Sequence, residues 1–248
     1  MEVTAIVNRK GGVGKTATAQ ALGAGLIKKG YSVLYIDLDS QTNLTYALGA
    51  DPRRSGSMDV LIGDATAQEV IQHTQQGDVI AGAEVLAGAD AAIDGTGKEY
   101  RLKEAIDGLQ YDYIIIDTPA QLGTLTVNAL TAADSVIIPV QADIYSLQGI
   151  GQLNRTIAAV KKYCNHDLII KGILITRYNK RAIISRDMYS NLEDAAAQLN
   201  TRLYSTPIRE CISIKEAQAS QQDIYSYAPR SNAAKDYAGF LEEFMERE

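Results

Sequence analysis

Apolar residues along this 248-residue chain form short continuous runs that alternate with longer stretches of helical periodicity. Runs rich in Val and Ile predict strands buried on both faces, as in a parallel sheet. They read EVTAIVN, YSVLYIDLD, YDYIIIDTP, SVIIPVQ and LIIKGILITRY. Helices are predicted between them over residues 16–29, 122–133, 146–163 and 185–199. The repeated order of strand, loop and helix predicts an α/β fold, a doubly wound, mostly parallel sheet flanked by helices.

The least regular part of the chain is residues 51–97, where Gly and Ala are scattered through AGAEVLAGADAAIDGTG. Weak helices and one strand near residues 79–86 are predicted here. No linker, repeat or low-complexity tract interrupts the sequence. We therefore expect residues 1–248 to form a single domain.

Composition and charge narrow the classes of function. Hydrophobic residues make up 46% of the chain and charged residues 22%, as in ordinary globular proteins. The net charge of −6 argues against a globally basic nucleic-acid-binding protein, so any DNA contact must come from a local group of basic residues. The two cysteines, Cys164 and Cys211, lack a C-x-x-C spacing and indicate neither a zinc nor an iron–sulfur site. Without a secretory signal or an apolar run of membrane-spanning length, a cytoplasmic protein is expected.

A glycine-rich loop, NRKGGVGKTATAQ, follows the first predicted strand at residues 8–20. It nearly fits the phosphate-binding pattern G-x-x-x-x-G-K-[ST], but Arg9 takes the place of the first glycine and a second lysine, Lys10, follows it. A strand before such a loop and a helix after it are the setting that phosphate binding requires. The sequence therefore predicts a nucleotide site at this loop.

The residues of this loop have separate expected tasks. The glycines let backbone N–H groups converge on phosphates at the start of a helix. Lys15 would bring positive charge to the outer phosphates, and the Thr16 hydroxyl would be a ligand of Mg²⁺. The predicted nucleotide contacts of the loop are Gly11, Gly12, Val13, Gly14, Lys15, Thr16 and Ala17.

The motif K-G-G-x-G-K-[ST], here residues 10–16, resembles the hallmark of the ParA/MinD group of deviant Walker A ATPases. The resemblance continues through YIDLDSQTNLTYALG, residues 111–149, ILITRYNKR and APRSNAAKDYAGFLEEF, and so covers nearly the whole chain. It implies a P-loop NTPase fold, ATP and Mg²⁺ as cofactors, and a homodimer that forms on ATP binding. In this family the early lysine, here Lys10, reaches phosphates bound by the other subunit, which makes catalysis conditional on dimerisation.

Three aspartates match the acidic motifs of the family. The resemblance implies that Asp39 orients the attacking water, that Asp37 supports the site, and that Asp117 holds Mg²⁺ through water. Each aspartate could instead cap the element that follows it. The predicted catalytic residues are Lys10, Lys15 and Asp39, and the predicted metal-site residues are Thr16, Asp37 and Asp117. The chain departs from the family pattern at Ala17, Ser40 and Ala120, none of which removes a charged group.

The predicted base is adenine. The stretch NKRA at residues 179–182 begins like the guanine-reading N-K-x-D, but Ala182 stands in place of the aspartate and cannot accept hydrogen bonds from guanine. In the family, residues after this strand and around a later P-x-R stretch line the base. The predicted base contacts are Asn179, Pro207 and Arg209.

The end of the chain separates two branches of the family. MinD-type members end in a basic amphipathic helix that lies on membranes, whereas the polar residues around the apolar stripe at 237–245 are mostly acidic here. We therefore predict a helix packed into the core and expect no membrane as a partner. No helix-turn-helix precedes the loop, as in the short ParA proteins.

The resemblance thus implies an ATP-dependent DNA segregation ATPase. Its ATP-bound dimer would bind DNA non-specifically, associate with the nucleoid, and hydrolyse ATP when a ParB-like partner stimulates it. Two alternatives stay open: a MinD-like cell-positioning ATPase, and an ATP-locked scaffold with little turnover. The expected DNA contacts are Lys215, Arg230 and Lys235, and a further basic cluster comprises Arg177, Lys180, Arg181 and Arg186.

Overall fold

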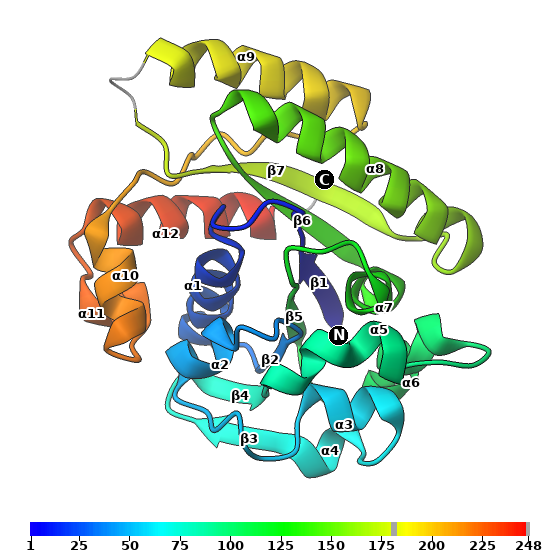
Figure 1. Ribbon diagram of the computed structural model, residues 1–248. Helices are drawn as coiled ribbons and strands as arrows, with labels where there is room; N and C mark the ends of the chain where they lie inside the picture. The colour runs from blue at the N-terminus through cyan, green and yellow to red at the C-terminus, as the bar shows by residue number, and fades with distance from the viewer. Residues whose placement is uncertain (180–182, 247–248) are drawn as a thin grey trace.

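The structure, a computed structural model, describes residues 1–179 and 183–246 (Figure 1). The predictions that concern Lys180, Arg181 and Ala182 lie outside these residues, as does the side chain of Arg186. Within the described residues, seven strands form one sheet in the order β3-β4-β2-β5-β1-β6-β7. Every neighbouring pair is parallel except β3 and β4. The predicted doubly wound, mostly parallel sheet is confirmed, and its strands are β1 Glu2–Ile6, β2 Val33–Asp37, β3 Ile71–Thr74, β4 Gly77–Ile80, β5 Tyr113–Asp117, β6 Ser135–Gln141 and β7 Ile169–Thr176.

The irregular stretch 51–97 differs from the prediction because it carries two strands instead of one. β3 and β4 form an antiparallel hairpin, and only Val79 and Ile80 of the predicted strand belong to β4. The rest of that prediction is wrong, since Glu84–Gly88 is a short 3-10 helix, η1. β3 is an edge strand that buries few side chains, and its sequence, IQHT, contains no apolar run. Hydrophobic patterning therefore does not detect it.

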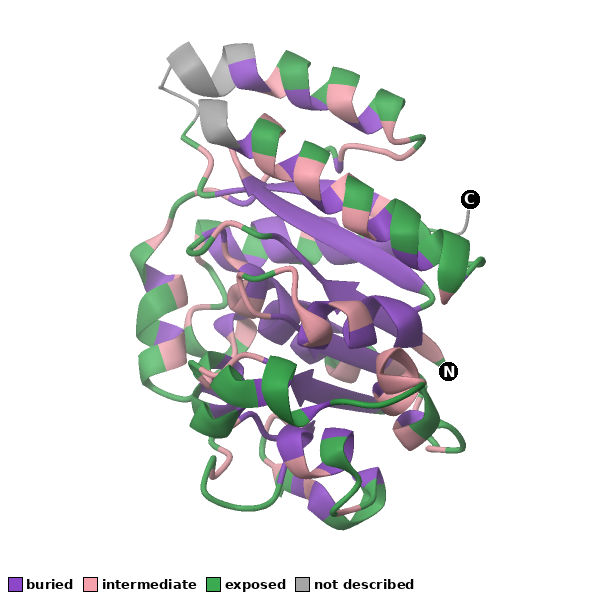
Figure 2. Ribbon diagram, turned by 45° about the vertical axis from the view of Figure 1, so that its right-hand side comes forward, coloured by how far each residue is buried: buried purple, intermediate pink, exposed green. Residues whose placement is uncertain are grey.

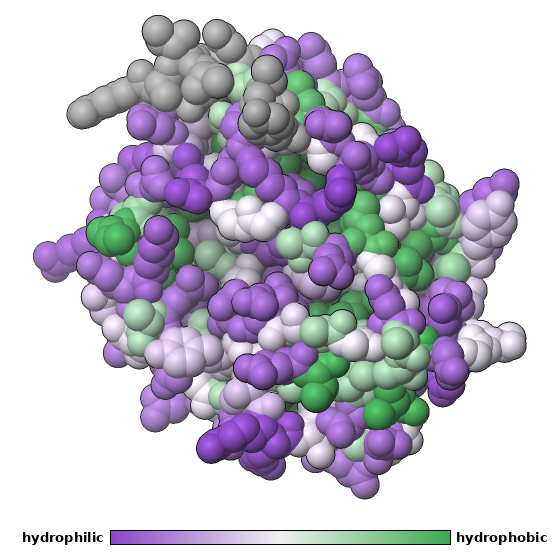
Figure 3. All heavy atoms as spheres, viewed as in Figure 1, coloured by the Kyte–Doolittle hydropathy of each residue, from purple (hydrophilic) through white to green (hydrophobic). Residues whose placement is uncertain are grey.

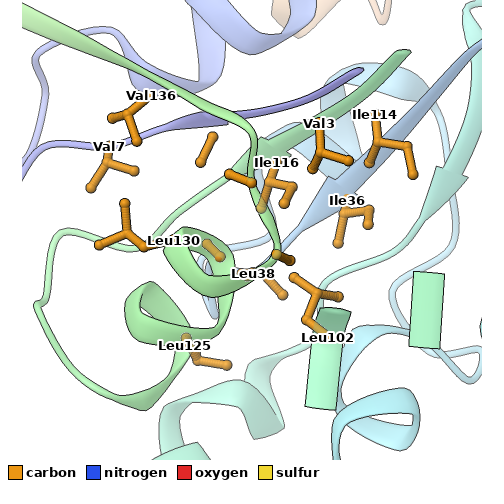
Figure 4. Close-up of a cluster of buried hydrophobic side chains, with 14 of the residues drawn as sticks. Val3, Val7, Ile36, Leu38, Leu102, Ile114, Ile116, Leu125, Leu130 and Val136 are labelled. Atoms are coloured by element: carbon orange, nitrogen blue, oxygen red, sulfur yellow. The ribbon is translucent and has the colours of Figure 1, made fainter. Parts of the chain in front are cut away.

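Helices lie on both faces of the sheet, and two apolar clusters fill the space beneath them. Neighbouring residues of a strand point to opposite faces, so Ile114 and Ile116 belong to one cluster and Ile115 to the other. Figure 4 shows part of the first cluster, and Figure 2 shows burial concentrated on the strands and on the inner sides of the helices. The helices are α1 Lys15–Lys28, α2 Asn43–Leu48, α3 Ser57–Ile62, α4 Ala67–Val70, α5 Ala89–Ala92, η2 Lys98–Tyr100, α6 Arg101–Ile106, α7 Thr124–Ala132, α8 Ile144–Tyr163, α9 Ile183–Gln198, α10 Ile212–Ala219, α11 Ile224–Tyr227 and α12 Asn232–Met245.

The last helix, α12, packs beside α1 in the second cluster. Its apolar stripe includes Tyr237, Phe240, Leu241 and Phe244, each at most 5% exposed. The prediction of a core-packed terminal helix is therefore confirmed. Exposing this stripe to water would cost about 25 cal/mol of folding free energy for each Å² of apolar surface exposed.

The irregular stretch also supplies the start of α7. Asp90 Oδ1 accepts a hydrogen bond of 2.8 Å from the backbone N–H of Thr124, the first residue of this helix. This hydrogen bond is the main cause that lowers the pKa of Asp90. A Cβ on Gly123 would lie 2.9 Å from both carboxylate oxygens of Asp90, so a larger residue here would require the Asp90 side chain to shift. Residues 84–92 are thereby tied to the loop that follows β5.

The outer surface is mainly polar on the face shown in Figure 3, where apolar side chains gather over the region of α5 and α7. Val85 in η1, at 62% exposure, is one of the large apolar side chains in contact with solvent. In the described part of the chain, no helix has both the length and the apolar character needed to span a membrane.

Candidate functional site

The loop between β1 and α1 has the backbone geometry of a phosphate-binding loop. Gly12 and Gly14 adopt positive φ angles of 74° and 85°, a conformation that disfavours residues with a Cβ. Gly14 is the N-cap residue of α1, and no side chain caps this helix start. The first backbone N–H groups of α1 are therefore available to an anion, and the helix dipole favours negative charge there.

Lys15 is the first residue of α1 and is only 7% exposed. Burial lowers the pKa of its ammonium group, whereas the carboxylates of Asp117 and Asp39 raise it. These carboxylates and an incoming phosphate both favour the charged form of Lys15. The structure therefore brings together the predicted lysine and two of the three predicted aspartates.

Asp117 ends β5 beside the start of α1. Its Oδ2 accepts a 2.6 Å hydrogen bond from the Thr16 hydroxyl. Its Oδ1 is buried and has no hydrogen-bond partner among the described residues. Burial, and after it the nearby carboxyl of Asp37, raise the pKa of Asp117 to about 8 against the lowering effect of Thr16 and Lys15. Because Oδ1 has no donor in the described chain, a bound cation would stabilise the ionised form of this buried carboxyl, so Asp117 is a candidate metal ligand.

The donor set at this point fits Mg²⁺. Hydroxyl and carboxylate oxygens, here of Thr16 and Asp117, are the hard ligands that Mg²⁺ prefers. No group of three or more His, Cys, Asp or Glu side chains able to hold a metal occurs in the described ranges.

Asp37 and Asp39 occupy different positions although both follow β2. Asp37 is fully buried, and its oxygens accept hydrogen bonds of 3.0 Å from Asp39 N, 2.9 Å from Thr45 N and 2.7 Å from the Thr45 hydroxyl. Burial raises the pKa of Asp37 to about 6 against the lowering effect of these bonds. Asp39 is half-buried, and its Oδ1 accepts from Gln41 N at 3.0 Å. Asp37 therefore braces the loop that presents Asp39, and Asp117 has the more available oxygen for a metal.

A pocket of about 650 Å³ extends from the phosphate loop. The loop residues that line it are Gly11, Gly12, Gly14, Lys15, Thr16 and Ala17. The predicted contact Val13 is buried beneath the loop, where its carbonyl accepts a 2.7 Å hydrogen bond from the Thr176 hydroxyl. Asp39 also lines the pocket. The phosphate end of the pocket thus consists of residues that the sequence motif contains.

The other end of the pocket, which we call the base end, comes from three distant segments. Its lining includes Tyr46 of α2, Arg177 after β7, Glu210, and residues of α10 such as Lys215. Arg177 adopts a positive φ of 50° and its guanidinium pairs with the Glu210 carboxylate at 2.8 Å. Sequence reasoning did not identify Tyr46 or Glu210, since neither belongs to a motif, and it considered Arg177 only as a DNA contact.

The predicted base contacts Asn179, Pro207 and Arg209 lie next to this lining but are not among the described residues that form it. Ile208 and Glu210 face the pocket on either side of Arg209. The Arg209 guanidinium points to α12, where it bonds the buried carboxylate of Asp236 at 2.6 Å. The P-x-R stretch therefore reaches the pocket through its middle residue and the residue after it.

Lys10 does not face the pocket of its own chain. Its ammonium forms an ion pair with Asp143, in the connection between β6 and α8. It lines a separate hollow of about 420 Å³ together with Arg9, Ala120, Gln148, Gly149 and Gln152. This direction separates Lys10 from Lys15, although the two lysines stand in the same loop.

The three predicted DNA contacts are all exposed. Lys215 stands in α10 at the edge of the nucleotide pocket, Arg230 precedes α12, and Lys235 lies in α12. All three thus come from the last third of the chain, on or near two helices.

The parallel sheet and the loop at the end of β1 define a P-loop NTPase. Residues 1–170 match a family model described as an AAA domain. The sporulation initiation inhibitor protein Soj of Bacillus subtilis (strain 168) is 39% identical over 98% of this chain and 97% of its own length. The chromosome partitioning protein ParA of Caulobacter vibrioides (strain NA1000 / CB15N) is 35% identical over 100% and 95%. This chain therefore belongs to the ParA/Soj family, and the resemblance given by its motifs is confirmed.

A solved structure with the same fold is that of cobyrinic acid a,c-diamide synthase from Mycobacterium smegmatis. It is 36% identical, has a TM-score of 0.83, and covers 98% of this chain and 93% of its own. It contains ADP and magnesium in one crystal structure and an ATP analogue and magnesium in another.

Proposed function

We propose that this protein is a Mg²⁺-dependent ATP hydrolase of the partitioning type. The observation that carries the proposal is the buried Asp117 oxygen without a partner, beside Thr16 and the start of α1. The nucleotides and magnesium of the Mycobacterium smegmatis protein support the same ligands here. When bound, Mg²⁺ would be held by Thr16 and Asp117 and would offset the negative charge of the phosphates.

The residues of the chain divide the work of hydrolysis. The N–H groups of the phosphate loop orient the phosphates, and Lys15 stabilises the charge that develops on them. Asp39 positions the attacking water from the rim of the pocket, and Asp37 fixes the backbone of Asp39. Lys10 acts on the phosphates bound by a second copy, because its ammonium faces away from its own pocket.

The task of hydrolysis is DNA segregation. Soj and ParA, the relatives described above, are named for sporulation control and chromosome partitioning. An ATP-bound homodimer presents Lys215, Arg230 and Lys235 twice, which multiplies phosphate contacts and places the dimer on the nucleoid. A ParB-like partner then triggers hydrolysis. The burial of the apolar face of α12 favours this function over membrane attachment of the MinD type.

The test is binding of random-sequence duplex DNA with ATP, ADP or no nucleotide across a salt series, beside liposomes of anionic lipid. We expect binding only with ATP, and a log–log salt slope near −0.9 for each phosphate contact. In a dimer, Lys235→Ala removes two phosphate contacts and should reduce the magnitude of the total slope by about 1.8. Lys98→Ala, on η2, should leave the total slope unchanged. Equal DNA affinity in every nucleotide state, or ATP-dependent binding to liposomes alone, would reject segregation in favour of a membrane function.

The scaffold alternative is tested separately by turnover. An ATP-locked scaffold would release no phosphate beyond one equivalent per site, with or without DNA and partner. The presence of Lys10, Asp39 and Asp117 together in one chain leads us to expect multiple turnovers.

A further inference from the structure

Lys10 is held outside the nucleotide pocket by a carboxylate 133 residues away in the sequence. The ion pair joins Lys10 Nζ to Asp143 Oδ2, and the exposed fractions of the two side chains are 32% and 30%. Asp143 directly precedes α8. The pair therefore fixes the direction of the lysine that the proposed function needs on the phosphates of another copy.

The backbone around Lys10 is held by other contacts. Lys10 N donates to Asn8 Oδ1 at 2.9 Å, and the amide group of Gln141 donates to Gly12 O at 2.8 Å. Neither contact involves Asp143. Loss of the ion pair would therefore release the side chain of Lys10 while the loop keeps its shape.

Asp143 has a second task that can be separated from the first. Its Oδ1 accepts hydrogen bonds from Ser146, from N at 3.1 Å and from Oγ at 3.2 Å, and so caps the first turn of α8. Asparagine is an equally good cap residue and keeps an acceptor oxygen. Asp143→Asn therefore removes the charge that holds Lys10 and preserves the cap.

We propose that Asp143 is a positioning residue, which holds Lys10 in the free chain and releases it only when ATP phosphates of a second copy compete for the ammonium. The inference rests on the proposed function, in which Lys10 acts across a dimer. A triphosphate carries more negative charge than one carboxylate, so the exchange is favourable once the second copy is in place. Asp143 thereby opposes dimerisation until ATP is bound.

The size of the effect follows from the exposure of the pair. A partly exposed ion pair changes an equilibrium by about 1.5- to 5-fold. A symmetric dimer breaks two such pairs, so Asp143→Asn should tighten the ATP-dependent dimer by about 2- to 25-fold. Salt screens partly exposed charges. The tightening of the dimer by Asp143→Asn should therefore become smaller as salt rises from about 50 mM to about 500 mM.

The experiment is sedimentation of the full chain with Mg²⁺ and a non-hydrolysable ATP analogue. Four proteins are compared: wild type, Asp143→Asn, Lys10→Ala and the double variant. We expect Asp143→Asn to tighten the dimer when Lys10 is present and to have no effect in the Lys10→Ala background. Glu242→Gln is the matched control, because it removes another partly exposed pair, Lys29–Glu242 at 2.7 Å, between α1 and α12.

Two results would overturn the inference. One is a dimer unchanged or weakened by Asp143→Asn, and the other is equal tightening with and without Lys10, which would mean that Asp143 acts through α8. Asp143→Ser, which also keeps a cap oxygen, repeats the comparison if the asparagine variant folds poorly. Failure of the proposed function appears instead in the unaltered protein, as absence of an ATP-dependent dimer, or in Lys10→Ala, as hydrolysis at the normal rate.

Discussion

The two ends of the nucleotide pocket are built in opposite ways. Most of the phosphate end comes from consecutive residues of one strand, one loop and one helix, and the ends of β2 and β5 add Asp39 and Asp117 beside Lys15. The base end is assembled from α2, the end of β7 and α10, and an ion pair with side chains 48% and 58% exposed lies across it. Buried charges interact strongly and exposed pairs weakly. Substitutions at the phosphate end should therefore have large effects, and charge changes at the base end small ones.

The largest expected effect is that of Lys15→Ala. It removes the one ammonium group among the described lysines that lines the phosphate end, while the glycine loop keeps its N–H groups. A charge-assisted hydrogen bond in a buried site contributes about 3 kcal/mol, so ATP affinity should fall at least about 100-fold. Calorimetry with Lys28→Ala, at the far end of α1, gives the control. Unchanged affinity in Lys15→Ala would remove the basis for assigning this site.

Asp39→Ala should act on turnover and spare binding. In the proposed function its carboxylate positions water and does not hold the nucleotide, so we expect the variant to bind ATP, accumulate as a dimer and lose about 100-fold in stimulated kcat. Lys10→Ala should also bind ATP and hydrolyse it poorly. Phosphate release measured with the partner and DNA checks both, and a normal rate in either variant would exclude that residue from catalysis.

Asp117→Asn should stabilise the nucleotide-free protein while impairing Mg²⁺-dependent binding. The pKa of Asp117 is raised to about 8, so between pH 4 and that value the folded state holds a proton that the unfolded state has lost. Unfolding stability of the unaltered protein therefore falls as pH rises through this window. The variant lacks this loss of stability, and its advantage in unfolding free energy should grow from near zero at about pH 4 to on the order of 5 kcal/mol at about pH 8.

Urea unfolding at several pH values without nucleotide measures this difference. Asp94→Asn, in the exposed loop before η2, is a matched control in which the pH trend should equal that of the unaltered protein. A stability advantage of Asp117→Asn that stays constant with pH would mean that Asp117 is ionised throughout.

The smallest expected effect belongs to the base end. Glu210→Gln breaks the exposed pair with Arg177, and ATP affinity should change by no more than about 5-fold. The double variant Arg177→Glu with Glu210→Arg should return affinity toward the original value. A change above about 30-fold in Glu210→Gln would break the comparison, because it would show that this carboxylate contacts the nucleotide itself.

Sequence reasoning succeeded where structure is local. The strand, the positive-φ glycines and the start of α1 lie within one short stretch, and the buried aspartates end apolar runs that identify their strands. It failed where contacts are distant: Asp143 was not connected to Lys10, and Glu210 was not connected to Arg177. It also missed β3, because the short polar sequence IQHT becomes a strand only through pairing with β4. Arg209 was expected at the base because its motif suggested it, whereas the buried carboxylate of Asp236 draws its guanidinium to α12.

Asp90, in the irregular stretch 51–97, caps the start of α7. The length of the chain around Asp90 is therefore constrained, although the stretch is rich in small residues. Asp90 and Thr124 are 34 residues apart, yet a hydrogen bond joins them, and Gly123 lies close to the same carboxylate. A deletion within η1, or an insertion where η1 meets α5, would move the carboxylate away from the start of α7. The length of this segment therefore sets where Asp90 meets the loop after β5, in a hollow that Asp39 also lines.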